Sequence, residues 1–119
     1  MTNNGLSTAK IEQSNQRIDA LPPLRVLVDS LDMKARKSLG QNFLFNLNLT
    51  RRIARSARPF TGTTIEVGPG PGGLTRAILL EGACNLIAVE KDWRASRVLH
   101  SLIEAAGTRL TLVEGDALK

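Results

Sequence analysis

The residues best suited to chemistry lie in a glycine-rich turn at residues 65–73, which reads Ile-Glu-Val-Gly-Pro-Gly-Pro-Gly-Gly. A carboxylate, Glu66, stands in the short run before the turn, and a helix-forming stretch, residues 74–80, follows it. This order predicts a buried strand, a tight turn and a helix. Glycine is needed where the backbone takes a positive φ or where a ligand approaches closely. The N–H groups that open the helix offer a site for a polar ligand, so the turn predicts binding of a nucleoside-bearing cofactor.

The spacing of the turn alone leaves two cofactors open. Residues 68–73 fit the G-x-G-x-x-G pattern of dinucleotide-binding proteins, and Glu90 follows Gly68 by 22 residues. Glu66, however, would repel a pyrophosphate and attract a cation. The two prolines of the loop also remove two N–H donors that a phosphate would use. Both features favour S-adenosylmethionine, which is cationic and carries no phosphate, over a nicotinamide dinucleotide.

Two further carboxylates follow apolar runs in the same way. Glu90 ends the run at residues 85–90, and Asp116 closely follows the run at residues 110–114. In parallel sheets ligands bind outside the carboxyl ends of the strands, which is where Glu66, Glu90 and Asp116 are expected. Glu90 can accept both ribose hydroxyls, and Asp116 can accept the adenine amine. Each carboxylate alone is typical of a solvated strand end, whereas three in register with a glycine turn favour a binding site.

The elements that position these residues alternate between strand and helix. Between the second and third apolar runs, apolar residues recur at helical spacing from Trp93 to Ile103, and the helix is expected to end before Gly107. The alternation predicts an α/β fold with a parallel sheet and right-handed crossovers. A complete doubly wound domain usually has about five to seven strands. With about three parallel strands and flanking helices, the predicted Rossmann-like fold is incomplete.

The N-terminal region lacks the features of that domain. Residues 1–20 are rich in Asn, Ser, Thr and Gln and are predicted to form a disordered or loosely attached arm. Two prolines then precede residues 24–31, which are expected to form a short helix. We therefore divide the chain into an N-terminal arm, residues 1–32, and the first half of a cofactor-binding domain, residues 33–119.

Composition excludes several classes of protein. The 119 residues, 42% of them hydrophobic, allow one modest domain. The single cysteine, Cys84, cannot form an internal disulfide and provides no metal cluster, and His100 stands alone. The sequence contains no long apolar stretch and does not begin like a secretory signal. We therefore expect a cytoplasmic protein with no metal and no membrane partner.

Positive charge is concentrated in residues 33–59, which carry seven basic and no acidic side chains, while the other 92 residues carry nine basic and eleven acidic ones. Such a patch is typical of a protein with a polyanionic partner. Judged from charge only, a solvated helix face explains the patch equally well. Aromatic residues are sparse, which favours contacts with the backbone of folded RNA over base stacking. The candidate RNA-binding residues are Lys34, Arg36, Lys37, Arg51, Arg52 and Arg55.

The block Lys-Ser-Leu-Gly-Gln-Asn-Phe-Leu at residues 37–44, followed by the glycine turn, resembles the ribosomal RNA adenine dimethyltransferases. The resemblance covers about residues 33–119 and implies a Rossmann-like enzyme that uses S-adenosylmethionine. Members of the family methylate the exocyclic N6 of adenines. The similarity is greatest to the bacterial branch that dimethylates two adjacent adenosines near the 3′ end of small-subunit rRNA. It implies a pre-ribosomal particle as partner, a role in ribosome biogenesis and a monomeric full-length enzyme.

The resemblance assigns roles to individual residues. Asn42 and Leu44 match positions that contact the methionine end of the cofactor. Gly68 matches the glycine-turn contact, Glu90 the ribose ligand and Asp116 the adenine contact. For the last two residues, these roles agree with those inferred from the strand ends.

One expected feature is absent. The family's catalytic Asn-(Ile/Leu)-Pro-(Tyr/Phe) sequence should follow Asp116, yet the chain contains no tyrosine and no Asn-x-Pro, so the motif is expected beyond Lys119. We therefore assign no catalytic residue, interpret the chain as the N-terminal part of a longer enzyme and expect it to be inactive alone. Three alternatives remain at this point: a large-subunit rRNA methyltransferase of the macrolide-resistance type, a fragment of a nicotinamide-binding oxidoreductase, and a non-enzymatic RNA-binding module.

Overall fold

A computed structural model describes residues 2–3, 6–30 and 42–118. Their main sheet consists of three parallel strands in the order β3 (Thr64–Val67), β4 (Leu86–Glu90) and β5 (Leu110–Glu114). The register pairs Glu66 with Ala88 and Ala88 with Leu112. The alternation of strands and helices predicted from the sequence is therefore confirmed.

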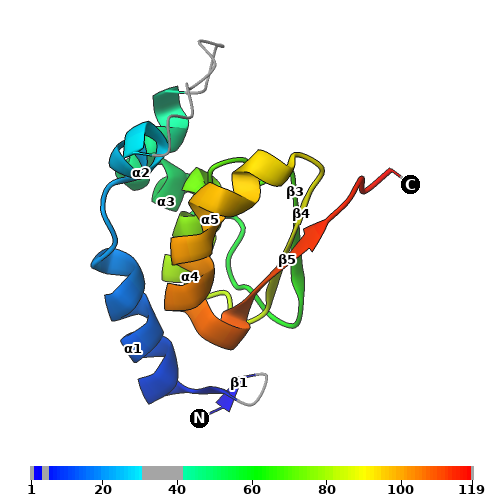
Figure 1. Cartoon of the computed structure of the whole chain (residues 1–119). Coiled ribbons are helices and arrows are strands. Elements are labelled where there is room, and N and C mark those ends of the chain that lie inside the picture. The colour runs from blue at the N-terminus through cyan, green and yellow to red at the C-terminus, as the bar shows by residue number, and fades with distance from the viewer. Residues whose placement is uncertain (1, 4–5, 31–41, 119) are drawn as a thin grey trace.

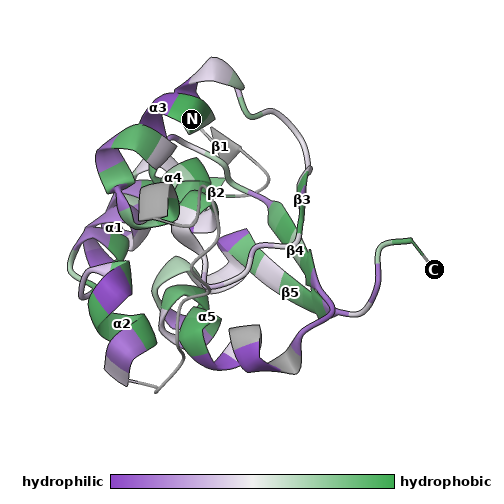
Figure 2. Cartoon of the chain, turned by 90° about the horizontal axis from the view of Figure 1, so that it is seen from above, coloured by the Kyte–Doolittle hydropathy of each residue, from purple (hydrophilic) through white to green (hydrophobic). Residues whose placement is uncertain are grey.

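The crossover helices α4 (Gly73–Leu80) and α5 (Trp93–Ala106) lie on the same face of the sheet. The chain crosses from β3 to β4 to β5 in one direction, and right-handed crossovers then place successive helices on one side. Figures 1 and 2 both show the helices gathered on one side of the sheet. The Cα radius of gyration is 13.7 Å.

The remaining helices complete this helical layer. They are α1 (Thr8–Asp19), α2 (Leu24–Ser30), α3 (Leu47–Ser56) and the 3₁₀ turns η1 (Asn42–Phe45) and η2 (Gly107–Arg109). Side-chain N-caps fix three helix starts, because Ser7, Asn46 and Asp92 each accept a backbone N–H from the first turn that follows. The short helix expected after the two prolines is confirmed as α2.

The N-terminal region differs from the loosely attached arm that its composition suggests. The short antiparallel pair β1 (Thr2–Asn3) and β2 (Leu6–Ser7) leads into α1, which packs against α5 and α4. Ile18 of α1 is fully buried in the main core, and Ser14 is 2% exposed. The polar residues that suggested a loose arm include two that attach α1 to the domain. The buried guanidinium of Arg109 donates hydrogen bonds to Ser14 and Asn15 at 3.1 and 2.7 Å.

The main core lies between the sheet and the helices. The helices contribute residues such as Leu79 of α4 and Leu99 of α5. The helix-facing positions of the strands contribute Leu86, Ala88 and Leu110. The opposite face of the sheet is open in the described part of the chain, and Ile65 and Val67 are 65% and 67% exposed there. Figure 2 shows these strands largely in the hydrophobic colour.

Candidate cofactor site

The carboxyl ends of the three parallel strands meet at one edge of the sheet. A cavity of about 160 Å³ opens there, lined by nine residues that include Gly68, Glu90 and Asp116. The structure thus brings together three of the five residues predicted to bind the cofactor. Lys91 also lines the cavity, and sequence reasoning did not select it because it follows the strand end without an evident pattern.

The glycine loop uses its own amides internally. The N–H of Gly68 donates to Val89 O at 2.8 Å, and the N–H of Gly72 donates to Pro69 O at 3.0 Å. Gly70 donates to the Glu90 carboxylate at 3.0 Å, and the two prolines of the loop have no N–H. Every backbone donor from residue 68 to residue 72 is therefore already occupied.

The loop nevertheless leaves space for a ligand to approach. Gly68 and Gly70 have φ angles of +71° and +54°, and a Cβ built on either residue would meet nothing within 4 Å. Gly72 is different, because its Cβ would lie 2.7 Å from a methyl group of Leu99. The first two glycines face open space beside the strand ends, and the third permits close packing against α5.

The carboxylate of Glu90 connects the elements that meet at this edge of the sheet. One carboxylate oxygen accepts the Gly70 N–H, and the other accepts the Asp92 N–H at 3.1 Å. The carboxylate is thereby fixed between the glycine loop and the start of α5. Each carboxylate oxygen has a second lone-pair site, so Glu90 can still accept hydroxyl donors from a ligand.

Glu66 is held one strand away on the helix-facing side of β3. Its carboxylate accepts a hydrogen bond from the Thr75 hydroxyl at 2.6 Å. Burial raises the pKa of Glu66, the Thr75 hydrogen bond opposes that rise, and the nearby charge of Glu90 adds to it. Thr75 was not selected from the sequence; its only signal is a hydroxyl in the first turn of the helix after the loop.

Asp116 follows β5 and is partly buried. One of its carboxylate oxygens accepts the N–H of Leu118 at 2.9 Å, which shapes the segment after the strand. The N–H of Gly115 donates to the backbone oxygen of Glu90 at 2.8 Å and ties this segment to β4. Asp116 therefore stays next to Glu90 at the cavity.

The catalytic motif of the family is expected beyond Lys119. Lys119 itself lies outside the described residues, which end at Leu118. The position of the motif therefore stays a prediction, and no catalytic role is assigned to a residue of this chain.

The other two predicted cofactor residues lie in η1. Leu44 packs against the start of α4, where its carbonyl oxygen occupies the position that a Cβ on Gly73 would take. Leu44 lines a separate apolar cavity of about 260 Å³ and does not line the cavity at the strand ends. The side chain of Asn42 is outside the described part of the structure.

The basic residues fall into two groups. Lys34, Arg36 and Lys37 lie outside the described residues. Arg51, Arg55 and Arg58 converge on the carboxylate of Glu81 at 2.6, 3.1 and 3.5 Å, whereas Arg52 is exposed. Two of the candidate RNA contacts, Arg51 and Arg55, therefore also join α3 to the end of α4, a role that the sequence did not indicate.

The fold and site together define a class of protein: a Rossmann-like α/β domain with a glycine turn and acidic strand ends. The family model described as ribosomal RNA adenine dimethylase matches residues 32–119. The chain therefore belongs to the ribosomal RNA adenine dimethylase family.

Curated relatives agree with this assignment, and a solved structure shares the fold. The chain is 59% identical over 103 residues to the ribosomal RNA small subunit methyltransferase A of Agrobacterium fabrum and 55% identical to that of Azorhizobium caulinodans. These alignments cover 86% of this chain but only 37% and 35% of the relatives. A solved structure of a putative RNA methyltransferase from Pyrococcus horikoshii shares the fold, with a TM-score of 0.53 and 24% identity over 93% of this chain and 52% of that one.

The described residues contain neither a membrane-spanning helix nor a cluster of metal-binding side chains. None of their helices is long and apolar enough to cross a membrane. No group of three or more His, Cys, Asp or Glu side chains among them is placed to hold a metal ion.

Proposed function

We propose that this chain forms the S-adenosylmethionine-binding half of an enzyme that dimethylates the N6 amines of two adjacent adenosines near the 3′ end of small-subunit rRNA. Family membership supports the reaction class, and the names of the relatives favour the small subunit over the large one. The observation that carries the cofactor assignment is the glycine loop, whose backbone donors from residue 68 to residue 72 are all internally bonded.

The residues present fit S-adenosylmethionine better than a dinucleotide. A dinucleotide-binding loop offers free backbone N–H groups to the pyrophosphate, and the loop from residue 68 to residue 72 has none to offer. The carboxylates of Glu90 and Asp116 line the cavity, and Glu66 lies near enough to Glu90 for their charges to interact. These groups favour a cation, and Lys91 is the one basic residue among the described residues that line the cavity. This excess of acidic over basic groups argues against the nicotinamide alternative.

The roles that we propose for single residues rest partly on the geometry and partly on the family resemblance. Glu90 accepts the ribose hydroxyls while it holds the Gly70 amide, and Asp116 accepts the adenine amine. Gly68 allows the cofactor to approach the backbone closely. The resemblance, and not the geometry, supports the proposal that Asn42 and Leu44 contact the methionine end. When bound, the cofactor supplies a methyl group activated by its sulfonium, and these residues of the chain bind and orient it.

RNA binding is assigned to the basic segment. Arg52 is exposed, and Arg51 and Arg55 keep 33% and 53% of their side-chain surface exposed while they bind Glu81. We infer that these arginines, together with Lys34, Arg36 and Lys37, contact RNA phosphates in a pre-ribosomal particle. Because the chain has no Asn-x-Pro and no tyrosine, we also infer that it binds cofactor without transferring the methyl group.

Calorimetric titration tests the cofactor assignment. The 119-residue chain is titrated with S-adenosylmethionine and, separately, with NAD. We expect binding of the first and none of the second. Binding of NAD alone would overturn the assignment, and failure to bind either would show that this chain does not form the site by itself.

A substitution then tests the role of Glu90. Glu90→Ala should weaken cofactor binding by about 1–3 kcal/mol, the range for loss of a charged hydrogen-bond acceptor. Glu90→Gln keeps an acceptor for the Gly70 N–H and separates loop support from ribose contact. The matched control is Glu114→Ala, because Glu114 is the register partner of Glu90 on β5 and is exposed. Equal affinities for Glu90→Ala and Glu114→Ala would rule out the ribose assignment.

A further inference from the structure

A third cavity, which is a polar cleft, lies at the N-terminal end of β5, at the opposite end of the strands from the candidate cofactor site. Its volume is about 290 Å³, and α1, η2 and the end of α5 form its walls. Lys10, Gln13 and Arg17 come from α1, and Thr108 and Arg109 come from η2. No function proposed above uses this cleft.

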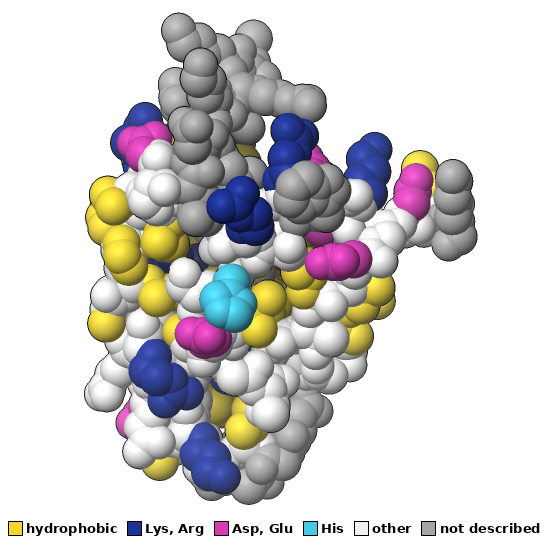
Figure 3. Space-filling view, in the orientation of Figure 1, with side chains coloured by type: hydrophobic (Ala, Val, Ile, Leu, Met, Phe, Trp, Pro, Cys, Tyr) yellow, Lys and Arg dark blue, Asp and Glu magenta, His cyan; other side chains and the backbone are white. Residues whose placement is uncertain are grey.

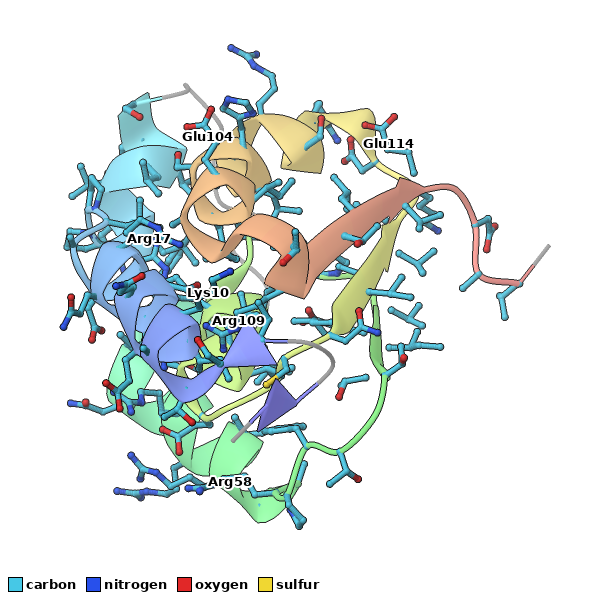
Figure 4. All side chains as sticks on the ribbon, turned by 90° about the horizontal axis from the view of Figure 1, so that it is seen from below. Lys10, Arg17, Arg58, Glu104, Arg109 and Glu114 are labelled. Atoms are coloured by element: carbon cyan, nitrogen blue, oxygen red, sulfur yellow. The ribbon has the colours of Figure 1, made fainter. Side chains whose placement is uncertain are left out.

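The cleft is strongly basic. Three of the described residues that line it are cationic, and none is acidic. Figure 4 shows Lys10, Arg17 and Arg109 together beside α1, with Glu104 and Glu114 elsewhere in the same view. Figure 3 shows basic side chains over α1 at the lower left of the molecule.

Arg109 gives the cleft a buried positive charge. The residue is 1% exposed, and its N–H donors reach backbone oxygens of Leu79 and Ala83 and side-chain oxygens of Ser14 and Asn15. All these acceptors are neutral, so the hydrogen bonds satisfy the donors but leave the charge uncompensated. Burial lowers the pKa of Arg109, as expected for a cation without a carboxylate beside it.

The exposed cations at the mouth keep donors available. Arg17 uses its Nε to reach Ala105 O at 3.1 Å, which leaves its two terminal nitrogens for a ligand. Among the described residues, the ion pairs include neither Lys10 nor Arg17. The carbonyls that end α5 would repel an anion, but Ala105 O and Ala106 O already accept hydrogen bonds from Ser14 and Arg17.

We propose that the cleft between α1 and η2 binds a phosphate group, held by Lys10 and Arg17 above the buried charge of Arg109. Planar guanidinium groups match phosphate oxygens in pairs. The volume admits a phosphate with several waters, since one water occupies about 30 Å³. The phosphate is a backbone phosphodiester of RNA, which rests on the proposed function; inorganic phosphate is the other source of the same chemistry.

The first arm of the test uses inorganic phosphate. The ¹⁵N-labelled chain is titrated with sodium phosphate against sodium chloride at equal ionic strength, and the amide signals of Gly107 and Thr108 are followed. We expect saturable shifts with phosphate that are lost in Lys10→Gln/Arg17→Gln. Arg17→Gln and Arg97→Gln form a matched pair, because both remove one exposed arginine and Arg97 is outside the lining. Absence of cleft shifts in the unsubstituted chain would overturn the proposal.

The second arm uses a short fluorescein-labelled RNA hairpin and measures affinity by anisotropy across a salt series. Loss of the contact with this one phosphate should make the slope of log affinity against log salt shallower by about 0.7–0.9 in Lys10→Gln/Arg17→Gln, whereas Arg97→Gln should keep the original slope. An unchanged slope in the double variant, with phosphate shifts still present, would overturn RNA as the source. Failure of the unsubstituted chain to bind RNA would overturn the RNA source and the proposed RNA contacts, while the phosphate arm would still decide the cleft.

Discussion

The Glu66 carboxyl group shows how the site affects a single residue. Burial raises its pKa above the usual value near 4.5, despite the hydrogen bond from Thr75. Between 4.5 and the raised value, the folded chain binds more protons at Glu66 than the unfolded chain does. Stability therefore falls as pH rises through this window. The ionised form that would attract a cationic cofactor is also the form that destabilises the fold.

Glu66→Gln tests this relation. Glutamine removes the charge and keeps an oxygen that accepts the Thr75 hydroxyl. We expect a higher free energy of unfolding than that of the unsubstituted chain at neutral pH and no gain near pH 4, measured by urea unfolding across that range. Affinity for S-adenosylmethionine should fall in the same variant. A stability change of the same size at both pH values would show that the Glu66 charge is not the cause, and Glu114→Gln serves as the exposed control.

At the scale of elements, Glu81 fastens α3 to the end of α4. Its side chain is 4% exposed and receives Arg51, Arg55 and Arg58. Burial acts to raise the pKa of Glu81, but the hydrogen bonds and charges of Arg51 and Arg55 outweigh it, so the pKa is lowered. A lowered carboxylate pKa contributes stability above the unfolded value, and this stability is lost as pH falls through the folded value.

Glu81→Gln should therefore destabilise the chain at neutral pH by about 1–2 kcal/mol. This is less than the 3–5 kcal/mol typical of a fully buried pair, because the arginines remain 33% to 56% exposed. The difference from the unsubstituted chain should disappear at pH values below the lowered pKa. Chemical denaturation at neutral and at strongly acidic pH measures this difference in unfolding free energy. The control is Glu104→Gln, because Glu104 is an exposed glutamate that contacts His100.

Gly73 makes a second contact between elements. Replacing a helical glycine by alanine usually stabilises a protein by about 0.5–1 kcal/mol. At Gly73 the sign should reverse, because the new Cβ would overlap the carbonyl oxygen of Leu44, a backbone atom with little freedom to move. We expect Gly73→Ala to destabilise by about 1–3 kcal/mol and to weaken cofactor binding by displacing η1. A stabilised variant in thermal unfolding would contradict this packing.

The elements also show which features the sequence can predict. The strands, α4 and α5 were predictable because apolar spacing and glycine positions are local signals, and parallel topology then brings Glu90 and Asp116 together. The attachment of α1 depends on Arg109 meeting Ser14, 95 positions away. The Glu81 cluster likewise depends on arginines 23 to 30 positions earlier. Such pairings of polar side chains leave no periodic pattern in the sequence.

At the scale of the whole molecule, the described part of the sheet is covered on one side only. Doubly wound sheets carry helices on both faces, and the chain spans little more than a third of the relatives it matches. Ile65, Val67 and Val113 are exposed on the uncovered face at 65%, 67% and 44%. These β-branched side chains come from the two outer strands, β3 and β5, and form an exposed apolar surface of the kind that promotes association. The 119-residue chain should therefore self-associate as its concentration rises.

Ile65→Thr/Val67→Thr should reduce this association. Threonine keeps the β-branched shape that suits a strand, so the substitutions change polarity more than backbone preference. Because both side chains are already about two-thirds exposed in the folded chain, the unfolding free energy should change by no more than about 0.5 kcal/mol per site. Sedimentation velocity over a concentration series measures association. Val26→Thr is the control, since Val26 is 52% exposed on α2, away from the sheet. If the double variant associates as strongly as the unsubstituted chain, contacts elsewhere, including the edge N–H and C=O groups of β3 and β5, drive the association instead.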